Sequence, residues 1–415
     1  MEERISKILT INGGSSSIKF ALFNSGNSLT ELLYGELKNI GSENSTLSFN
    51  NIATGEKNDT PVKTYDHTEA ATVLIDFLNE QNILATFTAI GHRIVHGMQH
   101  TEPEIITPEL LDELKKISAY DPEHLPEEIK LIELFVKHCP SLIQVACFDT
   151  SFHTTMPPVA KMLAIPRRYY SKGILRYGFH GLSYAYLMQE LENLAGKEAA
   201  QGKIILAHLG SGASLAAVKN GKSMDTTMGF TPASGLPMST RSGDLDPGVA
   251  WYLMQFEKMN PKEFNHLVNH ESGLLGVSGT SANMRELMEV EDANRYAKDA
   301  IELFCYQTKK GIGSFAAVLC GLDTLVFSGG IGEHSPEVRS KICDCLEFLG
   351  IELDEIKNMN NDAIISTTAS KVTVRIIKTN EELMIAKLVA DIMASNRNTI
   401  SNGQINHKIT LKKTR

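Results

Sequence analysis

The chain has 415 residues, a formal net charge of −9 and a hydrophobic fraction of 42%, which suits a globular protein of two domains. Its acidity argues against a nucleic-acid surface, which needs clustered lysines and arginines. No apolar run is long enough for a signal peptide or a membrane span, and the six cysteines contain no CxxC pair. We therefore expect a cytoplasmic protein with buried thiols.

The chain opens with an apolar run at residues 5–11, a small polar loop at 12–17 and a second apolar run at 18–23. This pattern predicts a strand, a tight loop and a second strand. The arrangement returns at residues 204–218, around the loop Gly210-Ser211-Gly212-Ala213-Ser214. An offset of about half the chain indicates two similar domains, because solenoid repeats recur every ~20–50 residues.

Further elements follow in alternation. Helical patterns cover residues 70–79, 108–117, 292–319 and 381–393, and buried strands are predicted at 88–95, 142–148, 325–327 and 372–377. Strands that alternate with helices give an α/β class. The basic tail at residues 396–415 has little apolar content and is expected to be disordered, with an interaction tail as the alternative.

Three segments have glycine and serine in a turn that follows a buried strand. They are residues 12–17, 208–214 and 328–333. Glycines let backbone N–H groups approach a phosphate, and serines add donors. None is a Walker loop or a dinucleotide fingerprint, and any one alone reads as a plain hairpin turn. Three in one chain favour the binding of nucleotide phosphates.

Other polar residues follow strands or lie between glycines. Arg93 and Asp149 end apolar runs, His180 lies between glycines, and Arg241 precedes two aspartates. Ligands collect at the carboxyl ends of strands in open α/β sheets, although an isolated buried arginine or histidine is more often a structural partner. Together these residues suit phosphoryl transfer to a carboxylate, which needs a fixed arginine, positive groups around the phosphoryl, Mg²⁺, and no strong base.

At this point the sequence resembles a known family. The segments INGGSSSIKF, GHRIVHG, FDTSFH, RYGFHGLS, AHLGSGAS, DTTMGFTP, MSTRSGDLDPG, FSGGIGEHSPEVR and TNEELMIA are similar, in order, to those of the acetate/propionate kinase family. The resemblance implies two ribonuclease-H-like domains of the actin/sugar-kinase superfamily with an interdomain cleft. The N-terminal domain would span residues 1–150, completed by a helix at about 383–395, and the nucleotide-binding domain would span 151–382.

The resemblance also implies an activity and its ligands. The expected reaction is acetate kinase activity, the reversible Mg²⁺-dependent transfer of the ATP γ-phosphoryl group to acetate, giving acetyl phosphate and ADP, with Mn²⁺ as a possible substitute metal. The protein would be a homodimer without nucleic-acid or membrane partners. Alternatives are propionate or butyrate as substrate, a family member that has lost turnover, and an ATP-dependent switch of the actin or chaperone type.

Site residues are carried over by matching motif. Asp149, His180 and Arg241 would be catalytic, Arg93 and His124 would bind the substrate, and Asn12 and Glu381 would support the metal. The nucleotide would contact Ser15, Ser17, Lys19, His208, Leu209, Gly210, Ser211, Gly212, Asn283, Met284, Arg285, Gly330, Ile331, Gly332, Glu333 and His334.

The sequence departs from the usual family motifs on the nucleotide side. Ser211 and His334 replace asparagines, and Asn283 replaces an aspartate. A fourth departure, Met98-Gln99, follows the arginine strand. The chemistry residues are all present, so we predict an active enzyme whose nucleotide preference the motifs leave open.

Overall fold

The computed structural model describes residues 6–412 apart from 15, 27 and 85, and the side chains of 7–396 apart from the same three. The predicted phosphate-loop residue Ser15 lies outside the described residues. The chain divides into two compact units. Unit 1 comprises Met1–Ser151 and Asn380–Arg415, and unit 2 comprises Phe152–Thr379.

Unit 1 is built on one mixed sheet. Its strands are β1 (Ser6–Gly13), β2 (Ile18–Ser25), β3 (Leu29–Lys38), β4 (Thr46–Asn51), β5 (Glu56–Pro61), β6 (Ala89–Ile94), β7 (Glu104–Ile105) and β8 (Ile143–Phe148), in the order β5-β4-β3-β2-β1-β6-β8-β7. Strands β1, β6 and β8 are parallel to one another, whereas β1 to β5 form an antiparallel meander. The carboxyl ends of β1, β6 and β8 therefore share one edge of the sheet.

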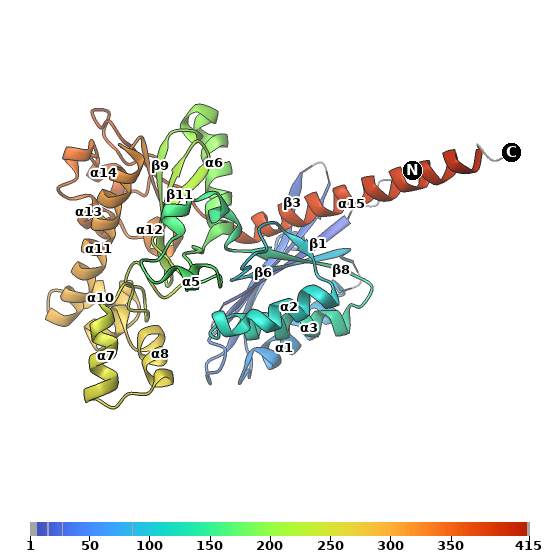
Figure 1. Cartoon of the computed structure of the whole chain (residues 1–415), viewed down its shortest axis with the longest axis horizontal. Helices are drawn as coiled ribbons and strands as arrows, with labels where there is room; N and C mark the ends of the chain where they lie inside the picture. Colours follow the sequence, from blue (N-terminus) through green and yellow to red (C-terminus); the bar gives the residue numbers. More distant parts are fainter. Residues whose placement is uncertain (1–5, 15, 27, 85, 413–415) are drawn as a thin grey trace. The chain divides into compact units, whose positions relative to one another are not determined.

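Helices cover both faces of this sheet (Figure 1). They are α1 (His67–Glu80), α2 (Pro108–Ile117), α3 (Leu125–His138) and α15 (Glu381–Lys412), with a short 3-10 turn η1 (Ser118–Tyr120). One face packs Leu9, Ile11 and Phe20 against α1 and α3. On the other face a Cβ at Gly91 would lie 2.4 Å from Ile385 and 2.6 Å from Val389 of α15. Only glycine lets α15 approach the strand this closely.

Unit 2 has a smaller sheet. Its strands are β9 (Lys203–Leu209), β10 (Ala213–Lys219), β11 (Lys222–Thr226), β12 (Thr324–Ser328) and β13 (Thr373–Ile376), in the order β11-β10-β9-β12-β13. Strands β9, β12 and β13 are parallel, and β9, β10 and β11 are antiparallel. This is the same order and direction as β3-β2-β1-β6-β8 in unit 1, so the two similar hairpins predicted from the sequence lie at corresponding places in two related sheets.

The helices of unit 2 vary in length. They are α4 (Pro158–Lys161), α5 (Arg167–Tyr170), α6 (Gly181–Ala200), α7 (Pro247–Phe256), α8 (Pro261–His270), α9 (Gly273–Ser278), α10 (Met284–Val290), α11 (Arg295–Leu319), α12 (Gly329–His334), α13 (Pro336–Cys343) and α14 (Glu355–Met359), with 3-10 turns η2 (Ser151–Thr155) and η3 (Glu347–Leu349). Ile204 and Leu206 of β9 pack against α6, whereas Leu215 of β10 meets Gly311 of α11. Because side chains alternate along a strand, α6 and α11 cover opposite faces.

Three sequence expectations can be compared directly with these elements. The α/β class is confirmed. The expected disorder of the tail stays a prediction; the backbone of α15 is helical as far as Lys412. Of the cysteines, Cys320 and Cys345 are exposed, since both follow helix ends, and the other four are buried. Within the described residues, no helix combines the length and hydrophobicity needed to cross a membrane.

Candidate active site

Two predicted residues, Arg93 and Asp149, meet at the carboxyl edge of the unit 1 sheet. The Nε and Nη2 atoms of Arg93 donate to Oδ2 of Asp149 at 3.0 and 2.6 Å, and its Nη1 donates to the carbonyl of Gly13 at 3.0 Å. Asp149 is fully buried, and the Arg93 side chain is 13% exposed. Burial opposes the charge on Arg93, but Asp149 and Glu128 outweigh it and raise the pKa of the guanidinium. Arg93 is thus a fixed cation at the end of β6.

Glu128 is a site residue that the sequence reasoning missed. Its Oε2 atom accepts the Val95 N–H at 2.9 Å, and Oε1 lies 3.7 Å from Nη1 of Arg93. The residue is 3% exposed, and burial raises the pKa of its carboxyl group to about 8 despite the nearby guanidinium. A glutamate on the buried face of the amphipathic helix α3 was the signal in the sequence.

A second acidic group lies beside the first loop. The Asn12 amide donates to Oε2 of Glu381 at 2.9 Å and to Oε1 of Glu382 at 3.1 Å, in the first turn of α15. Burial and the neighbouring Glu381 raise the pKa of Glu382. Lys19 pairs with Asn12 across the β1–β2 hairpin; burial lowers the pKa of its amine, but Glu382 and Glu381 outweigh this and the net shift is upward. Two carboxylates so close together favour a bound cation.

These residues fit a magnesium ion in type and number. Mg²⁺ usually takes one or two protein carboxylates and completes its shell with waters and phosphate oxygens. Within the described residues there is no group of three or more His, Cys, Asp or Glu side chains arranged around a metal position. Glu381 and Glu382, with Asn12, are candidate ligands for such a partial shell. Sequence reasoning named Asn12 and Glu381 and did not name Glu382.

His124 is placed at the start of α3, close in sequence to Glu128. Its Nδ1 atom lies 3.0 Å from Oδ1 of the buried Asp121, and its backbone carbonyl accepts the N–H of Glu128 at 3.1 Å. His124 thus belongs to the same helix end that brings Glu128 to Arg93. The first loop itself is held by His67, whose Nε2 lies 2.8 Å from the Gly14 carbonyl, and Ser17 is half-buried in it.

In unit 2 the second and third phosphate-like loops lie together. Strands β9 and β12 pair in parallel up to His208 and Ser328, so both loops leave the same edge of the sheet. Gly329 has φ +77°, and a Cβ on it would lie 2.7 Å from the Leu209 carbonyl, whereas a Cβ on Gly330 would meet nothing within 4 Å. The two loops approach to a distance that only glycine allows, and Gly330 faces open space.

Glu333 supports this loop. Its Oε1 atom accepts the N–H groups of Gly329 at 2.9 Å and Thr379 at 3.1 Å, and the residue is 9% exposed. Arg339 stabilises helix α12, because its Nη1 atom donates to the Gly332 carbonyl at 2.9 Å. The carboxylate predicted to contact a nucleotide therefore has a clear role in shaping the turn.

His180 and Arg241 lie on one side of the second loop. A Cβ on Gly212 would be 3.1 Å from Nε2 of His180 and 3.7 Å from Nη2 of Arg241. The rings of His180 and His208 lie with centroids 4.3 Å apart. Arg241 also donates from Nη1 to the Pro232 carbonyl at 3.0 Å. Two predicted catalytic groups thus border the loop that the sequence assigned to phosphate.

The remaining predicted nucleotide contacts differ in exposure. Leu209 and Met284 have buried side chains, so any contact they make with a ligand is through the backbone. Asn283 caps α10 by accepting the Arg285 N–H at 3.0 Å. Arg285 is exposed and lies 3.5 Å from Glu289, and His334 is exposed beside Glu333. The exposed or half-buried members that complete this set are Gly210, Ser211, Gly212 and Ile331.

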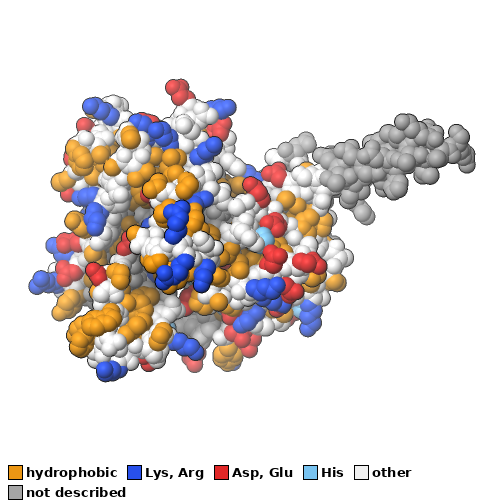
Figure 2. Space-filling view, viewed as in Figure 1, with side chains coloured by type: hydrophobic (Ala, Val, Ile, Leu, Met, Phe, Trp, Pro, Cys, Tyr) orange, Lys and Arg blue, Asp and Glu red, His pale blue; other side chains and the backbone are white. Residues whose placement is uncertain are grey.

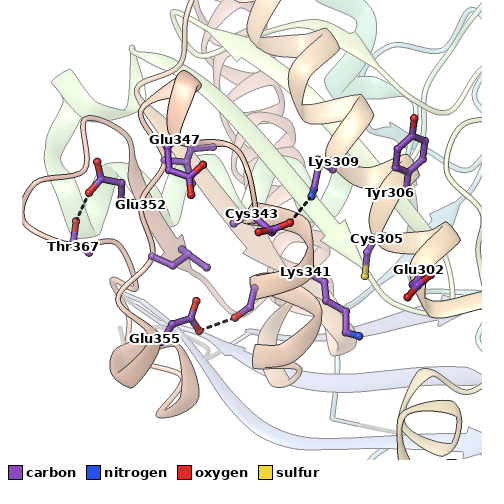
Figure 3. A pocket seen from close by; sticks show the side chains of 14 residues that line it. Glu302, Cys305, Tyr306, Lys309, Lys341, Cys343, Glu347, Glu352, Glu355 and Thr367 are labelled. Atoms are coloured by element: carbon purple, nitrogen blue, oxygen red, sulfur yellow. Dashed lines mark hydrogen bonds and ion pairs between the residues drawn. The ribbon is translucent and has the colours of Figure 1, made fainter. Parts of the chain in front are cut away.

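A separate cavity of about 810 Å³ opens between α11 and α13 (Figure 3). Glu302, Tyr306 and Lys309 line it from α11, and Lys341 and Glu355 line it from α13 and α14. Its lysines are paired, Lys309 with Asp344 at 3.4 Å and Lys341 with Glu291 at 3.1 Å. It contains none of the residues predicted for chemistry.

Comparison with known proteins identifies the family. The sequence matches the acetokinase family over residues 7–387. The chain belongs to the acetokinase family. Among its relatives, the acetate kinase of Thermoanaerobacterium thermosaccharolyticum is 42% identical over 94% of this chain and 99% of that protein. The acetate kinase of Geobacillus kaustophilus is 41% identical over 92% of this chain and 98% of that protein.

Solved structures of the acetokinase family have the same fold. A propionate kinase from Francisella tularensis superposes with a TM-score of 0.86 at 37% identity, covering 92% of this chain and 99% of that one. Porphyromonas gingivalis acetate kinase gives a TM-score of 0.81 at 37% identity, covering 92% and 98%. The family resemblance read from the motifs is confirmed, and the protein is a kinase that uses ATP and ADP.

Proposed function

We propose that this acetokinase-family enzyme transfers the γ-phosphoryl group of ATP to the carboxylate of acetate, reversibly, giving acetyl phosphate and ADP. The observation that carries the proposal is the placement of His180 and Arg241 at Gly212, on a glycine loop that lies against a second glycine loop. Such a set of N–H donors and positive groups suits the equatorial oxygens of a transferring phosphoryl group.

Arg93 is proposed to bind and orient the carboxylate of the acid. A carboxylate is ionised at pH 7, so one of its oxygens can attack the γ-phosphorus without a general base. The new bond is between that oxygen and phosphorus, and the bond from phosphorus to the β–γ bridging oxygen breaks, leaving ADP. Asp149, which accepts two N–H groups of Arg93, holds the guanidinium in one orientation.

Mg²⁺ is proposed as the metal, held by Glu381 and Glu382 with Asn12 beside them. When bound, it would neutralise the charge of the nucleotide phosphates. Mn²⁺ has the same preference for oxygen ligands and would substitute. The raised pKa of Glu382, caused by burial and by Glu381, supports a cation at this place.

The most specific part of the proposal is which short-chain acid is the substrate. The relatives named acetate kinase favour acetate, and the Francisella protein named propionate kinase makes propionate the second candidate. One methylene in a small pocket is worth only ~1–3 kcal/mol, so the two activities can overlap.

The test is a coupled assay of ADP release with Mg-ATP, with and without acetate, in which hydroxylamine traps the acyl phosphate. We expect acetate-dependent ADP release and a hydroxamate product, with a lower kcat/KM for propionate and butyrate. ADP release that ignores the acid would instead indicate an ATPase switch. Nucleotide binding without turnover on any short acid would indicate a family member that has lost activity.

We also propose a homodimer that works in the cytoplasm. Helix α7 has no buried residue and exposes Trp251, Tyr252 and Phe256, each more than half accessible, and Figure 2 shows apolar side chains gathered over this helix. Exposed aromatic groups of this kind are typical of subunit interfaces. Sedimentation velocity across a dilution series tests the dimer. The free buried thiols suit a reducing compartment.

A further inference from the structure

His180 is held at its Nδ1 atom by two buried hydroxyl groups. Its Nδ1 lies 2.8 Å from Oγ of Ser214, and the same Oγ is hydrogen-bonded to the hydroxyl of Tyr184. Ser214 and Tyr184 are both fully buried. The chain of groups therefore runs from a tyrosine in α6, through a serine at the start of β10, to the imidazole of His180.

The backbone of His180 is fixed as firmly as its ring. The residue precedes α6 with φ +60°, a left-handed conformation that is strained for a residue other than glycine. The carbonyl of Phe179, the residue before it, accepts a hydrogen bond from Nε2 of the buried His153 at 3.0 Å. A strained conformation held by its surroundings is typical of a functional position.

In the same unit, the buried His153 makes a serine–histidine hydrogen bond in which the donor can be assigned. Burial lowers the pKa of His153 to about 4, so the ring is neutral. Because a carbonyl can only accept, the proton of that ring is on Nε2, and Nδ1 accepts from the hydroxyl of Ser223 at 2.9 Å. A serine hydroxyl that donates to a histidine Nδ1 thus already occurs beside His180.

We propose that Tyr184 and Ser214 are positioning residues that hold His180 as a neutral imidazole with its proton on Nε2. In this arrangement the tyrosine hydroxyl donates to Ser214 Oγ, and the serine hydroxyl donates to Nδ1 of His180. The inference rests on the proposed function, in which Nε2–H of His180 donates to an oxygen of the transferring phosphoryl group. It assigns roles to two residues outside the motif positions taken as catalytic.

The direction of Nε2 agrees with this role. The atom points toward Gly212, on the side where Nη2 of Arg241 lies. The neighbouring ring provides an internal comparison, because Nδ1 of His208 lies 2.8 Å from Ser183 Oγ, which in turn lies 2.8 Å from Thr379 Oγ1. The second hydroxyl in the His208 contact is aliphatic, whereas the second hydroxyl in the His180 contact is a phenol, a better hydrogen-bond donor.

The kinetic test uses Tyr184→Phe and Ser214→Ala, with Tyr186→Phe as the matched control on the same helix. Each of the first two variants should lower kcat roughly tenfold, the equivalent of one hydrogen bond, with KM for ATP and acetate within about twofold of wild type. The double variant should lose no more than the worse single one, because the hydroxyls act in series. Tyr186→Phe should behave as wild type.

A second readout does not depend on turnover. In wild-type protein labelled with ¹⁵N-histidine, the Nδ1 signal of His180 should be that of an unprotonated acceptor and Nε2 that of a protonated donor. In Tyr184→Phe the acceptor contact weakens, so the pKa of His180 should rise and Nδ1 should protonate at higher pH. Thermal unfolding checks that each variant is folded.

The two readouts separate the ways in which the inference can fail. A protonated Nδ1 in folded wild-type enzyme, or a Tyr184→Phe variant with raised KM and unchanged kcat, would overturn it. Wild-type enzyme with the expected ¹⁵N signals but no acid-dependent activity would instead overturn the proposed function and leave the assigned tautomer standing.

Discussion

Arg93 faces two buried carboxyl groups, and only one of them bonds to it directly. Asp149 accepts two of its N–H groups, whereas Oε1 of Glu128 stays 3.7 Å away. Burial raises the pKa of the more distant carboxyl group to about 8, and the attraction of the guanidinium does not offset this effect.

The raised pKa of Glu128 predicts a pH dependence of stability. Its pKa is about 8 in the folded protein against 4.5 in the unfolded chain, so the folded state binds more protons and its stability falls as pH rises through this window. The buried His92 and His153, with pKa values lowered to about 4, titrate in the unfolded chain near 6.5 and add little above pH 7. From pH 7 to 8, wild type should therefore lose about 1 kcal/mol relative to Glu128→Gln.

Urea unfolding of both proteins at pH 7.0, 7.5 and 8.0 measures this difference. Exposed Glu133→Gln on the same helix is the control and should follow wild type. Parallel stability curves for wild type and Glu128→Gln would contradict the assignment of a proton to Glu128.

Substitution of the α15 carboxylates is predicted to weaken Mg²⁺ binding specifically. Glu381→Gln and Glu382→Gln each remove one negative charge from the group beside Asn12. We expect the Mg²⁺ concentration for half-maximal activity to rise about 10- to 100-fold, a range typical of weakened metal sites, with part of the activity restored at high Mg²⁺. A Mg²⁺ titration of activity measures this. A lower kcat with an unchanged Mg²⁺ midpoint would place the metal elsewhere.

At the scale of elements, the loop between β12 and α12 has two adjacent glycines with different requirements. Gly329 has φ +77°, and a Cβ on it would clash with the Leu209 carbonyl, whereas a Cβ on Gly330 would meet nothing within 4 Å. Gly329→Ala should destabilise the protein by about 2 kcal/mol or more, because it combines strain with a clash. Gly330→Ala should keep the stability and raise KM for ATP, because its methyl group enters the space proposed for phosphate.

Urea unfolding and ATP saturation curves of the two variants form a matched pair. If Gly330→Ala lost stability as Gly329→Ala does, or bound ATP as well as wild type, then the third loop would not be a phosphate loop.

Elements with a clear hydrophobic pattern could be predicted from the sequence, and those without one could not. The helix at 108–117 and the strands near 88–95 and 142–148 were expected close to where α2, β6 and β8 lie. Strand β5 reads EKNDTP and is fully exposed, so no alternation marks it. Its place depends on the ladder with β4, a contact that the local sequence does not encode.

The site residues also fall into two groups, those that the sequence made visible and those that it did not. Arg93, Asp149, His180 and Arg241 lie beside glycines or strand ends, where side chains are not needed for packing, and this made them visible. Glu128, Tyr184 and Ser214 lie inside regular elements, at positions that a core would occupy. The buried face of α3 marks Glu128, and Ser214 ends the second glycine loop. Their roles, however, come from contacts with residues far away in the chain, which a local pattern does not show.

At the scale of the whole molecule, the family match ends at residue 387 while the chain continues to 415. Truncation after residue 396 removes neither Glu381 and Glu382 nor the buried residues Ile385 and Val389 that pack on Gly91. We expect this variant to keep wild-type kcat and urea midpoint. Truncation after Thr379 should instead yield protein that unfolds at much lower urea and has no activity.

A reduced kcat in the 396 truncation, with an unchanged unfolding midpoint, would show that the basic tail takes part in the reaction. Replacement of its five Lys and Arg residues by Gln in the full-length chain would then separate charge from length.

The chain order of unit 1 has a consequence for synthesis on the ribosome. Its sheet is complete once β8 has been made, yet the helix that covers the face around Gly91 is the last element to be translated. All of unit 2 emerges in between, so a nascent chain carries an uncovered apolar surface while more than 200 residues are added (Phe152–Thr379). The same late helix brings Glu381 and Glu382, so a chain released early lacks both its cover and its proposed metal ligands. We therefore expect incomplete products to be inactive and open to proteolysis.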